Sequence, residues 1–183
     1  MTAYVIGFAG SIASGKSTLS AAVARELGWV RASFGNSVRD EARQRGLDPV
    51  SREVLQALGA ELIEAGWRQF CWSLLQRAGW HPGQNLVIDG VRHVKAVETL
   101  RSQVNPATFH LIYLDVPDGI REQRLYERGI GLQEQRQVID WHSTEIEVQT
   151  ALAAIADVHL SSDMNLNENM RRVLAAVFSQ DKC

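Results

Sequence analysis

Residues 10–17 combine amino-acid types and spacing that could bind a phosphate group. They read Gly10-Ser-Ile-Ala-Ser-Gly15-Lys16-Ser17, which fits the pattern G-x-x-x-x-G-K-[ST]. The two glycines let the backbone bend sharply and approach an anion, because neither carries a Cβ. Backbone N–H groups of the loop and of the following helix can then point at the phosphate, and Lys16 adds a positive charge. The Ser17 hydroxyl is a hard oxygen ligand that suits Mg²⁺.

The surroundings of this loop favour a phosphate cradle over a glycine- and serine-rich turn that matches the pattern by chance. An apolar run of strand length, residues 3–8, precedes the loop, and a helical pattern follows it. Thr18 could also reach the α-phosphate of a bound triphosphate. We therefore predict ATP and Mg²⁺ as cofactors. The predicted cofactor-binding residues of the loop are Gly10, Ser11, Ala13, Ser14, Gly15, Lys16, Ser17 and Thr18.

A carboxylate ends a second apolar run, Leu86-Val-Ile-Asp89, which is typical of a buried strand. The carboxyl ends of parallel strands share one edge of a sheet, so Asp89 should lie near the phosphate loop. A carboxylate there can hold a magnesium-bound water, and Asp89 and Ser17 are the predicted metal residues. A simple turn residue is the alternative, because Gly90 follows directly.

Two arginines follow strands at the same expected edge. Arg39 ends Ser33-Phe-Gly-Asn-Ser-Val-Arg39, and Arg92 follows Asp89-Gly-Val. Two guanidinium groups beside a phosphate loop suit bidentate capture of a second phosphate, which indicates a phosphorylated acceptor. A solvent-exposed helix arginine is the alternative for Arg39. The predicted substrate-binding residues are Ser33, Gly35, Arg39, Asp89 and Arg92.

Arg121, Arg124 and Arg128 have the spacing of one helix face after the fourth predicted strand. Such runs are usually solvated faces, but this helix should start near the nucleotide edge, with Gly129 and Gly131 as a flexible exit. Phosphoryl transfer needs charge neutralisation and exclusion of water around the γ-phosphate. We therefore predict a short arginine-bearing lid at about residues 124–142.

Strand and helix patterns alternate along the chain. Strands are expected at 3–8, 29–34, 85–89, 109–115 and 158–160. Helices are expected at 16–27, 37–45, 51–65, 67–78, 93–103, 117–128, 134–155 and 165–179. Strands that are apolar throughout are typical of a parallel sheet covered on both faces. The prediction is one α/β domain over 1–183, a three-layer α/β/α fold with a five-stranded parallel sheet, and a helical acceptor-binding insertion at about 35–80.

The composition of the chain limits the kinds of binding partner and the compartment that we expect. The 183 residues carry a formal net charge of −2, so neither a nucleic-acid backbone nor an anionic membrane is an expected partner. The two cysteines, Cys71 and Cys183, favour a reducing cytoplasm over a disulfide framework. No basic stretch precedes an apolar one at the N-terminus, and we expect no signal peptide. We expect a cytoplasmic monomer or homodimer with a small-molecule nucleotide acceptor.

Together these motifs resemble the P-loop nucleoside-monophosphate kinase group, adenylate kinase-like in plan. Residues 35–39 resemble its acceptor-binding G-[DN]-x-x-R, and residues 89–92 its D-G-[FY]-P-R without the proline. Residues 114–117, followed by Arg124 and Arg128, resemble its L-D-V-P lid entry. The resemblance implies that Arg124 stacks on the ATP adenine, which makes it a further cofactor-binding residue, and that Arg128 contacts phosphates. The implied catalytic residues are Lys16, Arg92, Arg124 and Arg128.

The chain also resembles uncharacterised archaeal and bacterial proteins described as dephospho-CoA kinase-like or adenylate kinase-like. This resemblance rests on residues 39–47, on 89–92 and on Ala156-Asp157. The chain departs from the group in its short lid, where Arg136 is one candidate arginine and His142 and Glu145 stand where others are expected. Ser33-Phe-Gly-Asn36 also replaces the Asp-x-Asp of dephospho-CoA and shikimate-type kinases.

The sequence thus predicts an ATP- and Mg²⁺-dependent kinase that transfers the γ-phosphoryl group to a nucleoside or deoxynucleoside monophosphate or a similar phosphate acceptor. An acceptor phosphate is already ionised near neutral pH, so no general base is required. The alternatives are a P-loop ATPase or nucleotide-dependent switch, a dephospho-CoA kinase-like enzyme, and a pseudo-kinase that binds nucleotide as a regulatory ligand. The chain lacks Asn-Lys-x-Asp, which argues against a GTPase.

Overall fold

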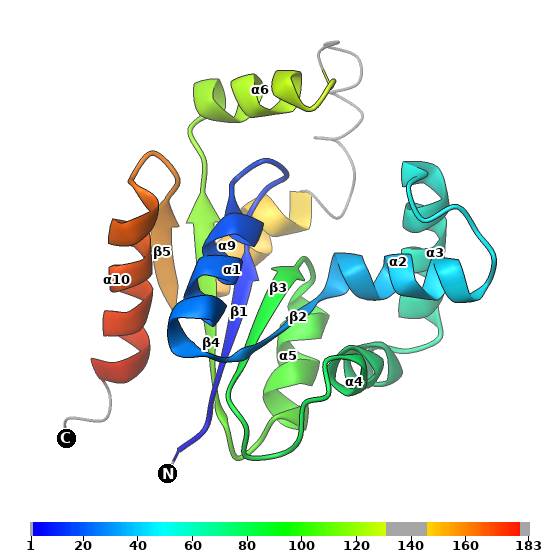
Figure 1. Ribbon diagram of the computed structural model, residues 1–183, viewed down its shortest axis with the longest axis horizontal. Helices are drawn as coiled ribbons and strands as arrows, with labels where there is room; N and C mark the ends of the chain where they lie inside the picture. The colour runs from blue at the N-terminus through cyan, green and yellow to red at the C-terminus, as the bar shows by residue number, and fades with distance from the viewer. Residues whose placement is uncertain (1, 131–145, 180–183) are drawn as a thin grey trace.

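A five-stranded, all-parallel sheet forms the centre of the molecule (Figure 1). The computed structural model describes residues 2–130 and 146–179. The strands are β1 Tyr4–Ala9, β2 Val30–Ser33, β3 Leu86–Val91, β4 Thr108–Asp115 and β5 Val158–Ser161. Their order across the sheet is β2-β3-β1-β4-β5, and each neighbouring pair is parallel. The predicted fold class and all five predicted strands are confirmed.

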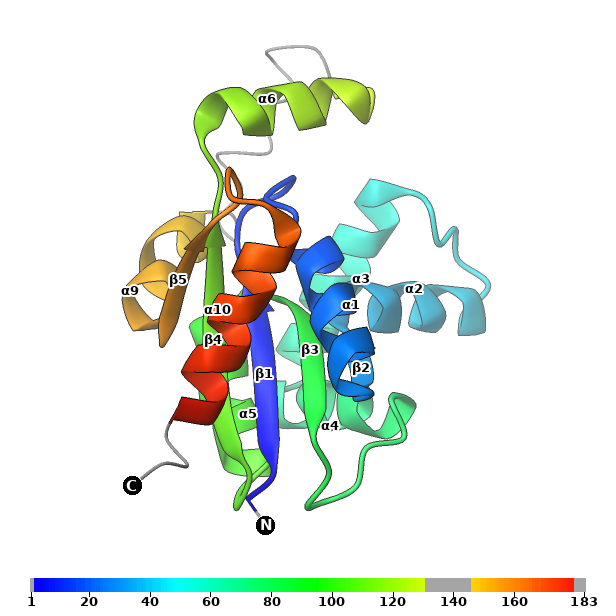
Figure 2. The ribbon, with the colours of Figure 1, turned by 60° about the vertical axis from the view of Figure 1, so that its left-hand side comes forward.

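Helices cover both faces of the sheet (Figures 1 and 2). One face carries α1 Lys16–Leu27 and α10 Leu166–Phe178. The opposite face carries α2 Phe34–Gln44, α3 Arg52–Glu64, α4 Trp67–Arg77, α5 Val94–Gln103, the π-helical turn η1 Val148–Leu152 and the short α9 Ala153–Ile155. Helix α6, Asp118–Glu127, covers neither face but lies across the carboxyl ends of the strands in both views.

The central strand β1 shows why this sequence forms a covered sheet. All six of its residues are buried. Its side chains alternate between the faces, so Val5 joins the core under α2–α5 while Ile6 and Phe8 join the core under α1 and α10. Continuous apolar character is therefore required here, as expected for a parallel strand with helices on both sides.

Two helix predictions need correction. The helix expected at 37–45 begins at Phe34, because the Ser33 hydroxyl accepts a hydrogen bond from the Asn36 N–H and caps the helix there. The helix expected over 134–155 is helical throughout its described part, residues 146–155, but residues 148–152 within it form a π-helical turn instead of regular α-helix. Residues 131–145 lie outside the described part of the chain, and with them much of the expected lid, including Arg136, His142 and Glu145.

The order of the strands brings the predicted motifs to one edge. The loop after β1 lies where the connections diverge, toward β3 on one side and β4 on the other, which is the position where such sheets bind ligands. Helices α2–α4 lie between β2 and β3 in the chain; α2 and α3 project to the side of the sheet in Figure 1, whereas α4 packs beside α5. Within the described residues, none of the helices has the length and apolar character that a membrane crossing would require.

Candidate nucleotide-binding site

The loop after β1 has the backbone of a phosphate cradle. Gly10 and Gly15 have φ angles of 147° and 94°, and Ala13 adopts a positive φ of 68°, which is uncommon for a residue with a Cβ. A Cβ on Gly10 would lie 2.4 Å from the carbonyl oxygen of Leu114 on β4. Glycine at position 10 is therefore required both by its φ and by the closeness of β4.

Polar groups of the loop are buried in a way that suits an anion. Lys16 is buried, and its Nζ donates a hydrogen bond of 3.0 Å to the Ser11 carbonyl. The Ser14 Oγ is buried and has no hydrogen-bond partner among the described residues. A buried hydroxyl without a partner is unfavourable unless a ligand supplies one. Ser17 and Thr18 are exposed at the start of α1, beside the positive end of the helix dipole. These groups fit the phosphates of ATP.

Helix α6 is attached to this loop through arginine side chains. Arg121 Nε donates to the Ile12 carbonyl at 3.3 Å. Arg124 Nη1 donates to the carbonyls of Ala13 at 3.1 Å and Ser14 at 3.0 Å. Carbonyls that point at a guanidinium leave the N–H groups of the same loop for the phosphate.

The same arginine also reaches the loop after β5. Arg124 Nη1 lies 3.4 Å from the Ser162 Oγ, so the side chain bridges the two loops. Arg128 is exposed at the end of α6. The stacking of Arg124 on adenine and the contact of Arg128 with phosphates stay predictions.

Asp89 lies on β3 as expected, but it has a partner that sequence reasoning missed. Arg31 on β2 donates from Nη2 to Asp89 Oδ2 at 2.7 Å. The strand also continues through Gly90 to Val91, so Asp89 is not a turn residue. Its other oxygen, Oδ1, is buried without a partner among the described residues. A buried, unshared carboxylate oxygen fits an outer ligand of Mg²⁺, with the Ser17 hydroxyl as the inner oxygen.

The predicted acceptor residues lie around the start of α2 and the end of β3. Arg39 is exposed and donates to Asn36 Oδ1 at 3.3 Å, and its Nη1 would lie 3.2 Å from a Cβ on Gly35. Ser33 caps the same helix. Arg92 follows β3 and is half-buried. These residues are on neighbouring strands and their extensions, as expected, because Ser33 pairs with Asp89 in the sheet register.

Glu147 is a second residue that the sequence did not single out. Its Oε1 accepts a hydrogen bond of 2.7 Å from the Val94 N–H at the start of α5, and its Oε2 lies 2.8 Å from His93 Nδ1. The His93 ring in turn lies 5.0 Å from that of Trp67 at the start of α4. Glu147 therefore holds the segment that directly follows Arg92. No local signal could have found it, because its partners are more than 50 positions away in the sequence.

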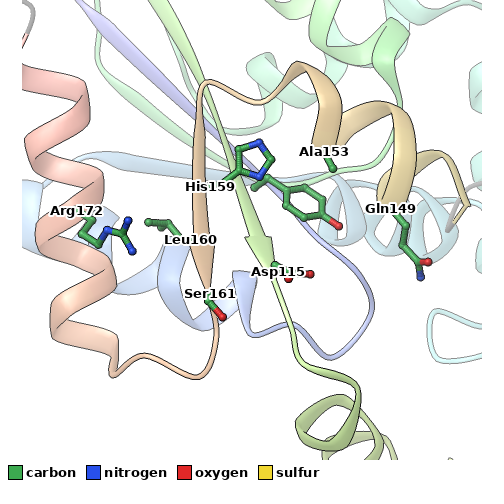
Figure 3. Close-up of a pocket in the computed structure, with 8 residues that line it drawn as sticks. Asp115, Gln149, Ala153, His159, Leu160, Ser161 and Arg172 are labelled. Carbon is green, nitrogen blue, oxygen red and sulfur yellow. The ribbon is translucent and has the colours of Figure 1, made fainter.

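A cavity of about 470 Å³ opens beside β4 and β5 (Figure 3). Tyr113 and His159 contact each other through their rings, and Asp115 and Ser161 stand at the strand ends. None of the predicted site residues lines it. A smaller cavity of about 200 Å³ lies among α2, α3 and α4 and is bordered by the ion pairs of Glu41. Neither cavity is the phosphate cradle itself.

The sheet order and the glycine-rich loop define a P-loop kinase-like fold. Solved structures with this fold include shikimate kinase from Acinetobacter baumannii, with a TM-score of 0.66, 16% identity, and coverage of 100% of this chain and 97% of the other. They also include APS kinase from Mycobacterium tuberculosis in complex with AMPPNP and APS, with a TM-score of 0.62, 16% identity, and coverage of 96% and 97%. At these identities the likeness concerns the fold alone.

The chain belongs to the UPF0200 protein family, and the family model described as AAA domain matches residues 6–148. The UPF0200 protein of Aeropyrum pernix is 32% identical over 152 residues, which cover 81% of this chain and 79% of the relative. That of Pyrobaculum aerophilum is 36% identical over 125 residues, which cover 68% of this chain and 66% of the relative's length.

Proposed function

We propose that this protein is an ATP- and Mg²⁺-dependent phosphotransferase that moves the γ-phosphoryl group to the phosphate of a nucleoside monophosphate or deoxynucleoside monophosphate. The donor half of the proposal is supported by the loop after β1, with its buried Lys16 and unpartnered Ser14 hydroxyl. The fold of the chain is also that of solved kinases.

The proposal of a phosphorylated acceptor depends on the charges of the residues predicted to bind that acceptor. Among the predicted site residues, the single carboxylate is Asp89, and Arg31 already pairs with it. Transfer to a hydroxyl is commonly assisted by a carboxylate that accepts the proton, whereas an ionised phosphate needs no such base. The other charged groups proposed for the acceptor are the guanidiniums of Arg39 and Arg92. This arrangement suits an acceptor that is itself anionic.

Each side chain then has a simple task. Lys16 binds ATP at the phosphoryl group that is transferred. Arg124 keeps the loop carbonyls turned away from this group. Arg39 and Arg92 hold the acceptor phosphate in line with the donor, so that catalysis is mostly alignment and charge stabilisation. Mg²⁺, held through Ser17 and Asp89, would supply charge neutralisation on the donor oxygens when bound.

A panel of acceptors tests the proposal. The protein is incubated with ATP and Mg²⁺ and, in turn, with each common ribo- and deoxyribonucleoside monophosphate and with dephospho-CoA, and products are identified by the added mass of one phosphoryl group. We expect at least one monophosphate to be converted, and a Lys16→Met variant to convert none.

Two arginines on α2 allow a test of whether Arg39 binds the acceptor specifically or only adds positive charge to the helix. Arg39→Gln should raise the acceptor KM by roughly 10- to 100-fold, the equivalent of losing 1.5–3 kcal/mol of hydrogen bonding to a charged group. Arg43→Gln is the matched control, because Arg43 is exposed on the same helix and pairs with Asp40 instead. ATP hydrolysis that needs no acceptor and is unchanged in Arg39→Gln would contradict the proposal and favour an ATPase.

A further inference from the structure

Arg31 connects three elements at the corner of the phosphate site. From β2 its Nε donates to Ser20 Oγ on α1 at 3.0 Å, and its Nη2 reaches the Ser17 carbonyl at 3.4 Å and Asp89 Oδ2 on β3 at 2.7 Å. Ser17 is the residue predicted to bind Mg²⁺, and Asp89 is the predicted outer ligand. One guanidinium therefore touches both members of the expected metal pair.

The two oxygens of Asp89 are in different situations. Oδ2 is taken by Arg31, while Oδ1 is buried without a partner in the described part of the chain. The Asp89 side chain is only 7% exposed. A carboxylate buried to this degree is unfavourable unless it is paired. Arg31 provides the pairing and, by occupying one oxygen, also decides which oxygen stays available.

Arginine suits this task better than lysine would. Its donors lie in one rigid plane, so contacts with Ser20, Ser17 and Asp89 fix the direction of the carboxylate as well as its charge. A lysine ammonium is a point charge on a flexible chain and would hold the carboxylate less precisely in direction.

We propose that Arg31 is a positioning residue for magnesium: it holds Asp89 so that Oδ1 remains the free acceptor for a water molecule on a Mg²⁺ ion bound with the nucleotide at Ser17. This inference rests on the proposed function. It assigns Arg31 no contact with the nucleotide or with the metal, and it makes the Arg31–Asp89 pair one functional unit.

The test measures nucleotide binding and needs no turnover. Affinity for AMPPNP is measured by titration calorimetry over a series of free Mg²⁺ concentrations and in EDTA, for the parent protein and for Arg31→Met, Arg31→Lys, Asp89→Asn and the double variant Arg31→Met/Asp89→Asn. Mg²⁺ is expected to increase the affinity for AMPPNP, and the Mg²⁺ concentration that gives half of this increase is the magnesium requirement. We expect Arg31→Met to raise this concentration by about 10-fold, as removal of an outer-shell partner does. Affinity in EDTA should stay unchanged.

The variants identify the pair as a unit. Asp89→Asn should raise the magnesium requirement to the same extent, the double variant should be no worse than either single one, and Arg31→Lys should recover part of the loss. Arg25→Met is the control for loss of an arginine, because Arg25 is exposed at the end of α1.

Three results would overturn the inference. An unchanged magnesium requirement in Arg31→Met, even with a lower Tm, would mean that Arg31 only braces the fold. A lower requirement would mean that its charge merely repels the cation. Additive effects in the double variant would mean that Arg31 and Asp89 act independently of each other. Failure of every acceptor in the phosphorylation panel concerns the proposed function and leaves this binding experiment interpretable.

Discussion

Replacing Gly10 by alanine should disable the phosphate loop while leaving most of the fold intact. The added Cβ would lie 2.4 Å from the Leu114 carbonyl oxygen and 2.9 Å from Ser14 Oγ, and ordinary contact begins at 3.4 Å. The loop must therefore move away from β4 by about 1 Å, and a displacement of that size in a positioned group typically lowers function by roughly 10²-fold. We expect AMPPNP affinity to fall by about that factor, or about 2.8 kcal/mol.

The stability effect should be smaller and separately measurable. The φ of 147° at Gly10 is strained for any residue with a Cβ, which costs on the order of 1–3 kcal/mol. For a chain of this size that lowers Tm by roughly 2–4 °C per kcal/mol. Calorimetric titration of AMPPNP well below Tm, together with a thermal melt followed by circular dichroism, separates the two effects.

Gly59 offers a matched control. It lies inside α3, and a Cβ there would meet nothing within 4 Å. Gly59→Ala should therefore stabilise the protein by roughly 0.5–1 kcal/mol through helix propensity and leave nucleotide affinity unchanged. A folded Gly10→Ala variant that binds AMPPNP as tightly as the parent would refute the reasoning, because the loop would then tolerate the clash without moving.

Three further outcomes are expected. Arg124→Ala should weaken AMPPNP binding by roughly 10-fold in calorimetry, because its hydrogen bonds to the loop carbonyls are charge-assisted. Unchanged affinity would mean that the loop holds its shape without α6. Glu147→Gln should raise the acceptor KM by roughly 3- to 10-fold and leave the ATP KM unchanged, since it loosens the contact with His93 beside the acceptor arginine; equal changes in both constants in steady-state kinetics would contradict this. Burial raises the pKa of the Cys71 thiol to about 12, so in a Cys183→Ser variant Cys71 should react with a thiol reagent at pH 8 only after unfolding. Fast labelling of the folded variant would show that this part of the core opens.

The sheet and the donor loop could be predicted because their information is local. The buried strands of this sheet are mostly apolar, and the loop pattern specifies its own glycines, lysine and serine within eight positions. The start of α2 was harder. The sequence Ser33-Phe-Gly-Asn36 reads as the end of a strand, whereas in the structure Ser33 caps a helix that begins at Phe34, with its Oγ accepting from the Asn36 N–H.

The contacts that complete the site could not be predicted, because they join distant segments. Arg31 pairs with a carboxylate 58 positions away, and nothing in its own strand marks it as different from a solvated edge arginine. Glu147 similarly becomes informative only when the fold brings it to the start of α5. Sequence patterns report burial and local geometry, whereas the choice of ion-pair partners follows from the topology of the whole sheet.

The helical segment α2–α4 enters and leaves the sheet through two strands that are direct neighbours. Val30 pairs with Leu86 and Ser33 with Asp89, so the segment is a side branch whose removal would interrupt no other strand pairing. Ion pairs join its helices to one another: Glu41 of α2 pairs with Arg77 of α4, and Arg45 at the end of α2 pairs with Glu61 of α3. If the proposed function holds, exchanging this branch between family members would change the surface offered to an acceptor without changing the β1 loop, provided that the side chains packed against the sheet, such as Phe70 and Leu74, are kept. Divergence in substrate within the family is therefore expected to concentrate in this branch, and chimeras made at its two strand junctions are a natural way to transfer acceptor preference.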